Sequence, residues 1–167
     1  MTGVQTCALP ISITQAANSE ISRENPESLF VTAFCAILDL ETGALEYCNA
    51  GHEPPYLLRS GEPPIRVSES GGPPLCVMED FPYESATLQL KPGDMLVVMT
   101  DGVVEATNKT NVLYGRPRTE AVLAEAMSAG KAQVIGEALR ANVAEFVAGA
   151  DPADDIALLV VRWTGTT

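Results

Sequence analysis

A chain of 167 residues has room for one domain with its own core. Hydrophobic residues make up 46% of the sequence, which excludes a disordered chain, and aromatic residues only 5%, so the core must be aliphatic. The net charge of -12 argues against a nucleic-acid partner or contact with an anionic membrane, because both need an excess of lysine and arginine. We therefore expect a cytoplasmic protein without nucleic-acid or direct membrane contacts, and the acidic balance also suits a protein that binds cations.

The first residues, MTGVQTCALPIS, do not fit the pattern of the rest of the chain. No basic segment precedes their short apolar run, so they do not predict a signal peptide. The string resembles the translation of a common sequencing adapter. We therefore expect residues 1–12 to be non-native, the native chain to begin within a longer gene, and residues 164–167 to form a tail.

The first half of the chain predicts a helix followed by short antiparallel strands. Residues 13–25 are weakly helical, and Pro26 ends that pattern. Residues 29–40, LFVTAFCAILDL, are rich in apolar and β-branched side chains and predict a buried strand, which a turn at residues 41–43 follows. Shorter apolar or alternating runs predict further strands at 44–49, 56–59 and 83–90, with a loop at 60–74.

The second half predicts two more strands and two helices. Residues 91–94, KPGD, predict a tight turn before the apolar strand 95–100. Residues 119–127 are helical, residues 131–148 carry an apolar stripe at helical spacing, and residues 156–163 predict a final strand. This order lacks strict βαβ alternation, so we expect an α+β fold with helices covering antiparallel sheets. The stripe consists of Val134, Ile135, Ala138, Leu139, Val143, Phe146 and Val147.

The four cysteines, Cys7, Cys35, Cys48 and Cys76, form no Cys-x-x-Cys pair and no cysteine-histidine cluster with zinc spacing. Cys35 and Cys48 lie in apolar segments, which predicts small core residues. We therefore expect free thiols, as is typical of proteins in a reducing compartment.

Carboxylates stand at the ends of two predicted strands. Asp101 follows the strand that starts at residue 95, and Asp154 and Asp155 precede the final strand. If these strands are antiparallel neighbours, the carboxylates converge at one end of a sheet, where they repel one another unless a cation neutralises them. Mg²⁺ and Mn²⁺ prefer such oxygen ligands, and Gly102 lets the chain leave the site without a side chain in the way. Ordinary turn chemistry explains the same residues without a metal, so both interpretations stay open on spacing alone.

A resemblance to a known family rests on five segments in this order: FVTAF, YCNAGHEPPYLL, LKPGDMLVVMTDGVVEATN, YG and DDIALLVVRW. Together they resemble the SpoIIE/RsbU-like serine phosphatases, a bacterial branch of the metal-dependent PPM phosphatases. The resemblance implies an α-β-β-α sandwich of antiparallel sheets flanked by helices, with residues 13–163 forming the C-terminal part of the phosphatase domain. It also implies a dinuclear Mn²⁺ or Mg²⁺ centre that activates a water for attack on phosphoserine or phosphothreonine, so no catalytic side chain is expected.

The resemblance carries over to four residues of the candidate site. Asp101 of the Thr-Asp-Gly segment matches a metal ligand of the family, and Asp154, the first acid of Asp-Asp-Ile, matches another. Gly102 and Asp155 are expected beside these ligands, in supporting positions. The only histidine, His52, lies in a motif that marks a hairpin exit in the family. We favour a role in fixing that turn over a role as a catalytic acid.

The sequence also departs from the family pattern. A Gly-Asp-x-x-x-Asp motif, whose aspartate bridges both metals in the family, and a Gly-His-Gly motif are missing. Ala157 replaces the usual threonine of Asp-Asp-Ile-Thr, and Asn108–Leu113 replaces a short acidic turn. We therefore expect an N-terminally truncated PPM fold that binds metal weakly and is inactive alone.

Three functions follow as hypotheses. The first is a phosphatase acting on a phosphorylated anti-anti-sigma regulator of the STAS type, with an upstream sensor domain outside this chain. The alternative is a pseudophosphatase that binds a partner in bacterial signalling without turnover, although the retained Asp101 and Asp154 argue against it. The third is an unrelated calcium-binding domain, although the EF-hand pattern is absent from the sequence.

Overall fold

The computed structural model describes four segments of the chain: residues 9–23, 25–68, 71–150 and 154–166. The chain divides into two compact units, which are Met1–His52 with Glu69–Gln89, and Glu53–Ser68 with Leu90–Thr167. Each unit holds one antiparallel sheet together with helical structure, so the predicted α+β class is confirmed.

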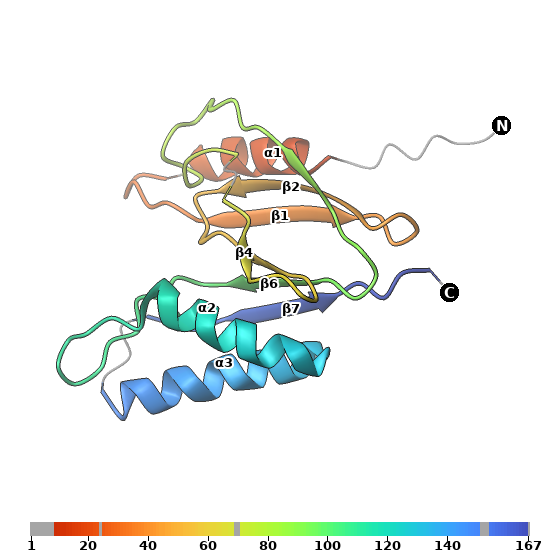
Figure 1. The fold of residues 1–167 in the computed structure, drawn as a ribbon. Coiled ribbons are helices and arrows are strands. Elements are labelled where there is room, and N and C mark those ends of the chain that lie inside the picture. The colour runs from red at the N-terminus through yellow and green to blue at the C-terminus, as the bar shows by residue number, and fades with distance from the viewer. Residues whose placement is uncertain (1–8, 24, 69–70, 151–153, 167) are drawn as a thin grey trace. The chain divides into compact units, whose positions relative to one another are not determined.

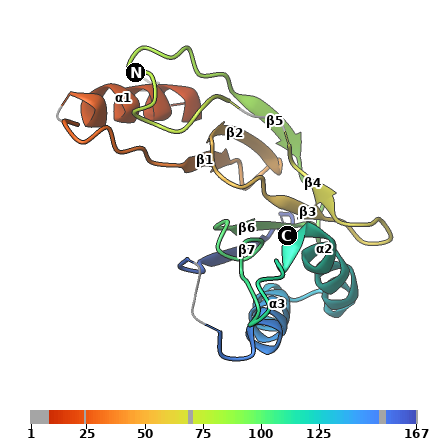
Figure 2. The same cartoon turned by 90° about the vertical axis from the view of Figure 1, so that its left-hand side faces the viewer.

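The first unit contains a helix and a three-stranded sheet with the strand order β1-β2-β5 (Figures 1 and 2). Its elements are α1 (Pro10–Ser22), β1 (Ala33–Leu38), β2 (Ala44–Ala50) and β5 (Ala86–Gln89). β1 and β2 form the predicted hairpin, with Cys35 opposite Cys48. The Gly43 N–H donates to the Asp39 carbonyl (2.8 Å) in the connecting turn, where Gly43 has a φ of 75° that glycine adopts without strain.

The prediction of a buried strand over residues 29–40 is wrong in extent and in burial. β1 covers only the Ala33–Leu38 part of this run and is half-buried. Leu29 and Phe30, which precede it, are each 64% exposed. β1 is an edge strand, whereas β2 lies at the centre of the sheet and is mostly buried. Apolar and β-branched composition favours both positions equally, because strand propensity depends on context.

Helix α1 packs against β1 and β2 through a small core. Ile11 and Ala17 contact a buried cluster that consists of Cys48, Ala50, Leu75 and Tyr83. Asn18 is only 1% exposed, and its side chain donates to the Met78 carbonyl (2.9 Å) and accepts from the Cys76 N–H (2.8 Å). These hydrogen bonds attach the polar side of the helix to the loop before β5, so no donor of Asn18 is buried without a partner.

The boundaries of α1 differ from the prediction. The helix begins at Pro10, three residues before the predicted start, because proline suits the first helical position. It ends at Ser22, three residues before the predicted end. Residues 10–12 therefore form the first turn of α1, although the sequence places them in the expected non-native segment. Residues 1–8 lie outside the described part of the chain, and the origin of residues 1–12 stays a prediction.

The second unit is built on a four-stranded antiparallel sheet with the strand order β4-β3-β6-β7 (Figure 2). Its strands are β3 (Tyr56–Leu58), β4 (Ile65–Arg66), β6 (Met95–Met99) and β7 (Leu158–Arg162). β6 and β7 pair along their whole lengths, from Met95 opposite Arg162 to Met99 opposite Leu158. β4 lies within residues 60–74, which the sequence predicts as a loop, because a strand this short shows no readable period.

Two helices cover one face of this sheet, and the helices and the sheet share one core (Figures 1 and 2). This core is mostly aliphatic, as expected, but it also buries Tyr56 and Tyr114. They are α2 (Gly115–Ala126) and α3 (Ala132–Val147), joined by the 3-10 helix η1 (Met127–Ala129). α2 begins four residues before its predicted start at residue 119. Five residues of the predicted α3 stripe are confirmed as core, since Ile135, Leu139 and Val143 are buried and Phe146 and Val147 pack against them, whereas Val134 and Ala138 are half-buried. The buried core residues are Tyr56, Leu58, Met95, Val97, Met99, Val103, Ala106, Tyr114, Leu123, Ile135, Leu139 and Val143.

The predicted turn at residues 91–94 is confirmed by a hydrogen bond from the Asp94 N–H to the Lys91 carbonyl (2.9 Å). Asp94 is 3% exposed, and its carboxylate accepts two hydrogen bonds from Arg59, at 3.1 Å from Nε and 2.8 Å from Nη2. The Trp163 N–H donates to the Asp94 carbonyl (3.1 Å). This buried ion pair ties β3 to the start of β6 and the end of β7, and the pKa of Arg59 is raised by its hydrogen bonds to Asp94.

Two further expectations concern the described residues only. Cys35, Cys48 and Cys76 are free thiols, as expected, and Cys48 is buried in the first unit, while Cys7 lies outside the described residues. Within the same segments, no helix combines the length and the apolar composition needed to cross a bilayer.

Candidate metal centre

The candidate acids lie at one end of the second unit's sheet. β6 and β7 are antiparallel neighbours, and Met99 opposite Leu158 is their last pair. Asp101 follows the end of β6, and Asp154 and Asp155 precede the start of β7, so all three belong to the same sheet end. The expected convergence of the two strand ends is therefore confirmed, while metal binding by Asp101 and Asp154 stays a prediction.

Thr100 joins the two strand ends by three hydrogen bonds. Its N–H donates to the Ala157 carbonyl (3.1 Å), and its hydroxyl donates to the Asp155 carbonyl (2.9 Å). The Ala157 N–H donates back to the Thr100 hydroxyl (3.0 Å). This role of Thr100 was not predicted from the sequence, although its place in Thr-Asp-Gly was a signal. This side chain holds the segment that bears Asp154 against the segment that bears Asp101.

Gly102 is needed for space at this junction. A Cβ atom at this position would lie 2.5 Å from the Asp155 carbonyl oxygen and 3.3 Å from the Asp154 carbonyl oxygen. Both neighbours are backbone atoms, so a side chain would force the strand ends apart. The prediction that Gly102 keeps the chain clear of the site gains its physical reason here, which is close backbone approach rather than a special turn conformation.

The carboxylate oxygens at this sheet end are of the type that a hard cation binds, but few of them are present among the described residues. Asp101, Asp154 and Asp155 are exposed, and the Asp154 Oδ1 accepts the Asp155 N–H (2.7 Å). Oxygen donors of this type are those that Mg²⁺ and Mn²⁺ take. Among the described residues, however, no three histidine, cysteine or acidic side chains gather as a metal site. The described residues therefore fit part of the ligand set of such a cation.

A second polar network, which the sequence did not reveal, lies at the same sheet end. In the β3–β6 pair Tyr56 lies opposite Val97, so the start of β3 adjoins the end of β6, and Glu53 stands just before β3. The Glu53 side chain is 7% exposed and accepts two hydrogen bonds from Arg116 of α2, at 3.0 and 2.9 Å. Arg66 of β4 lies 3.7 Å from the same carboxylate. Glu53 thus ties β4 and α2 to the start of β3.

Two side chains have raised pKa values here: Arg116 of this network and Tyr56, the first residue of β3. The pKa of Arg116 is raised, chiefly because its guanidinium donates hydrogen bonds to Glu53. The Tyr56 hydroxyl donates to Glu120 Oε1 (3.2 Å), and burial together with the negative charge of Glu120 raises the pKa of Tyr56 to about 12. Both groups therefore keep their protons throughout the physiological range.

The turn around His52 is held by Asn49. The Asn49 Oδ1 accepts the His52 backbone N–H (2.8 Å), and the Asn49 Nδ2 donates to the His52 carbonyl (3.0 Å). These contacts use the main chain of His52. The structure is consistent with a role of this segment in fixing the hairpin exit, and the Asn49 side chain provides the hydrogen bonds. The role of the His52 imidazole stays a prediction.

Comparisons with known proteins show the family to which the chain belongs. The family model described as Stage II sporulation protein E (SpoIIE) matches residues 2–164. The chain is 30% identical over 152 residues to Protein IcfG of Synechocystis sp., covering 90% of this chain and 24% of that protein. It is 25% identical over 126 residues to Phosphoserine phosphatase RsbU of Bacillus subtilis, covering 75% of this chain and 37% of RsbU.

Among solved structures, the phosphatase domain of the cell fate determinant SpoIIE from Bacillus subtilis matches with a TM-score of 0.66 at 22% identity, covering 92% of this chain and 66% of that one. This match shows a fold of the phosphatase-domain class. The chain belongs to the SpoIIE family, as its five sequence segments indicated. It spans about a quarter of IcfG and little more than a third of RsbU, at 24% and 37% of their lengths.

Proposed function

We propose that this chain forms part of a metal-dependent protein serine/threonine phosphatase, located in the cytoplasm. The observation that carries the proposal is that Asp101 and Asp154 lie at one sheet end. Thr100 joins the two strand ends by hydrogen bonds, and Gly102 leaves room for their close approach. Family membership and the name of the relative RsbU, a phosphoserine phosphatase, support the same activity.

The site residues would have separate tasks in this reaction. Asp101 and Asp154 would hold Mn²⁺ or Mg²⁺ through their carboxylates, and Asp155 would position Asp154 through the N–H that it donates to it. A divalent cation bound there would supply an activated water and neutralise charge on the phosphoryl group. We infer that the chain alone does not hydrolyse phosphoesters, because it lacks the Gly-Asp-x-x-x-Asp and Gly-His-Gly motifs of the family.

The proposed substrate is a phosphorylated regulator of the STAS type, as the family resemblance implies. A protein partner is supported by a solved structure of the RsbU and RsbW domains of Rv1364c from Mycobacterium tuberculosis. This structure matches with a TM-score of 0.68 at 25% identity, covering 94% of this chain and 43% of that one.

The test is Mn²⁺-dependent hydrolysis of para-nitrophenyl phosphate. It compares this chain with a chimera in which a relative supplies the two missing motifs, each with and without Asp101→Ala. We expect activity in the chimera alone and its loss in Asp101→Ala. Activity of the chain alone would overturn the inferred need for those motifs. A folded chimera that binds a phosphorylated STAS-type protein without hydrolysing it would favour the pseudophosphatase.

A further inference from the structure

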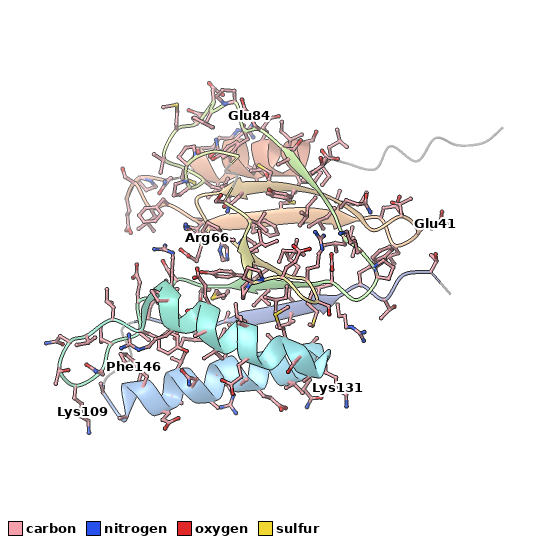
Figure 3. The ribbon with its side chains drawn as sticks, in the orientation of Figure 1. Glu41, Arg66, Glu84, Lys109, Lys131 and Phe146 are labelled. Atoms are coloured by element: carbon pink, nitrogen blue, oxygen red, sulfur yellow. The ribbon has the colours of Figure 1, made fainter. Side chains whose placement is uncertain are left out.

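An apolar pocket of about 480 Å³ adjoins the candidate metal centre within the second unit. Gly102 and Asp154 form part of its wall, so it is continuous with the residues proposed to hold the cation. The pocket lies near the C-terminal end of α3, where Figure 3 labels Phe146. The other end of α3 begins just after Lys131, which Figure 3 also labels. Its apolar lining consists of Ala106, Val143, Ala144, Val147, Ile156 and Leu158.

The pocket is built by the periodicity of α3. Val143, Ala144 and Val147 lie three, four and seven residues after Arg140, so the four share one face of the helix. Val143 packs into the core, whereas Ala144 is exposed at the surface. Ile156, on the facing segment, is 43% exposed. Small side chains on α3 therefore leave room for a guest beside an exposed apolar residue.

The pocket wall also contains the positively charged side chain of Arg140. Arg140 is exposed and forms no ion pair with any other part of the chain that the structure describes. The chain as a whole carries a net charge of -12, which repels an anionic phosphoprotein. A guanidinium in the same pocket wall as Asp154 lowers this repulsion where a phosphate-bearing segment would approach the site.

We propose that this pocket binds an apolar side chain next to the phosphorylated residue of a phosphoprotein substrate. The proposal rests on the proposed phosphatase function. Neighbouring residues of an extended peptide are spaced by about 3.3–3.6 Å, so a residue beside one held at Asp154 reaches a pocket that Asp154 itself lines. The volume lies within the range of about 300–1,000 Å³ that is usual for ligand pockets and accommodates a leucine or phenylalanine side chain. Ala144 and Val147 would then determine sequence specificity.

The test measures fluorescence polarisation of labelled phosphoserine peptides with MnCl₂ and the full chain. One peptide carries leucine on both sides of the phosphoserine, and the other carries alanine at both places. We expect the leucine peptide to bind about 10-fold more tightly, as burial of a few methylene groups in an apolar pocket allows. Ala144→Trp, which fills the pocket, should reduce this ratio to about one. Ala141→Trp, one turn earlier on α3 and outside the pocket lining, should keep it.

The outcomes separate this proposal from the proposed function. Equal binding of the two phosphopeptides, or a leucine preference that survives Ala144→Trp in a folded variant, would overturn the pocket assignment. If binding still required Mn²⁺ and Asp101 in that case, the proposed function would stand. The leucine peptide could also bind more tightly than the alanine peptide by the same ratio when Mn²⁺ is left out and when neither peptide is phosphorylated. That result would overturn both the proposed function and the substrate assignment. Circular dichroism of each variant checks that it is folded.

Discussion

The close approach of the two strand ends makes Gly102→Ala the sharpest structural test of the site. The added Cβ would lie 2.5 Å from the Asp155 carbonyl oxygen, and contacts of a Cβ below 3.0 Å essentially never occur. The backbone must therefore shift by at least the difference of 0.5 Å. Forced repacking of this kind costs about 1–3 kcal/mol of unfolding free energy. We expect Gly102→Ala to be destabilised by about 1–2 kcal/mol, because alanine also reduces the entropy of the unfolded chain.

Gly136→Ala is the matched control for this variant. A Cβ at Gly136, inside α3, would meet only the Val160 Cγ2 at 4.0 Å, which is an ordinary contact. Alanine is favoured over glycine inside a helix by about 0.5–1 kcal/mol, so this variant should be stabilised. Urea unfolding followed by circular dichroism measures both variants. If Gly102→Ala were as stable as Gly136→Ala, the tight junction at the candidate site would be refuted.

Three further predictions concern the polar networks of the second unit. Asp94→Ala should lower the unfolding free energy by about 3 kcal/mol, because it leaves Arg59 without its buried partner; a loss below about 1 kcal/mol in urea unfolding would contradict this. Glu53→Gln should lower the unfolding free energy by about 1–2 kcal/mol in urea unfolding. The loss is smaller than for a fully buried ion pair, because the arginine partners of Glu53 are partly exposed; an unchanged unfolding midpoint would show that these ion pairs do not stabilise the fold. At pH 8 Tyr56→Phe should be less stable than the wild type by about 1 kcal/mol, since the hydrogen bond to Glu120 is lost. The folded-state pKa of Tyr56, about 12, lies above its ordinary value of about 10, so the contribution of the neutral hydroxyl is present below pH 10 and is lost as the pH rises toward 12. The difference between the two proteins should therefore shrink or reverse by pH 11.5, and a constant difference would exclude the raised pKa.

The parts of the site that the sequence predicts are those that follow from strand order. Asp101 and Asp154 lie beside two apolar runs, and antiparallel pairing of neighbouring strands is enough to bring their ends together. The role of Gly102 was also predictable, although its cause, contact with the Asp155 backbone, needed the structure.

The parts that escaped prediction depend on contacts between distant residues. Glu53 and Arg116 are 63 positions apart, and Arg59 and Asp94 are 35 apart. Their pairing depends on the β3–β6 register and on the placement of α2, which no local pattern encodes. The burial of the predicted strand at residues 29–40 failed for a similar reason, because its position at the sheet edge is set by tertiary structure.

Mn²⁺ titration of the chain, followed by electron paramagnetic resonance, tests whether this sheet end provides part of a cation site. We expect weak binding that falls at least several-fold in both Asp101→Asn and Asp154→Asn. Binding should be unchanged in Asp80→Asn, which removes an exposed aspartate from the first unit. Equal Mn²⁺ affinity in all four proteins would mean that the metal binds the acidic surface at large, and it would contradict the assignment of Asp101 and Asp154 as ligands.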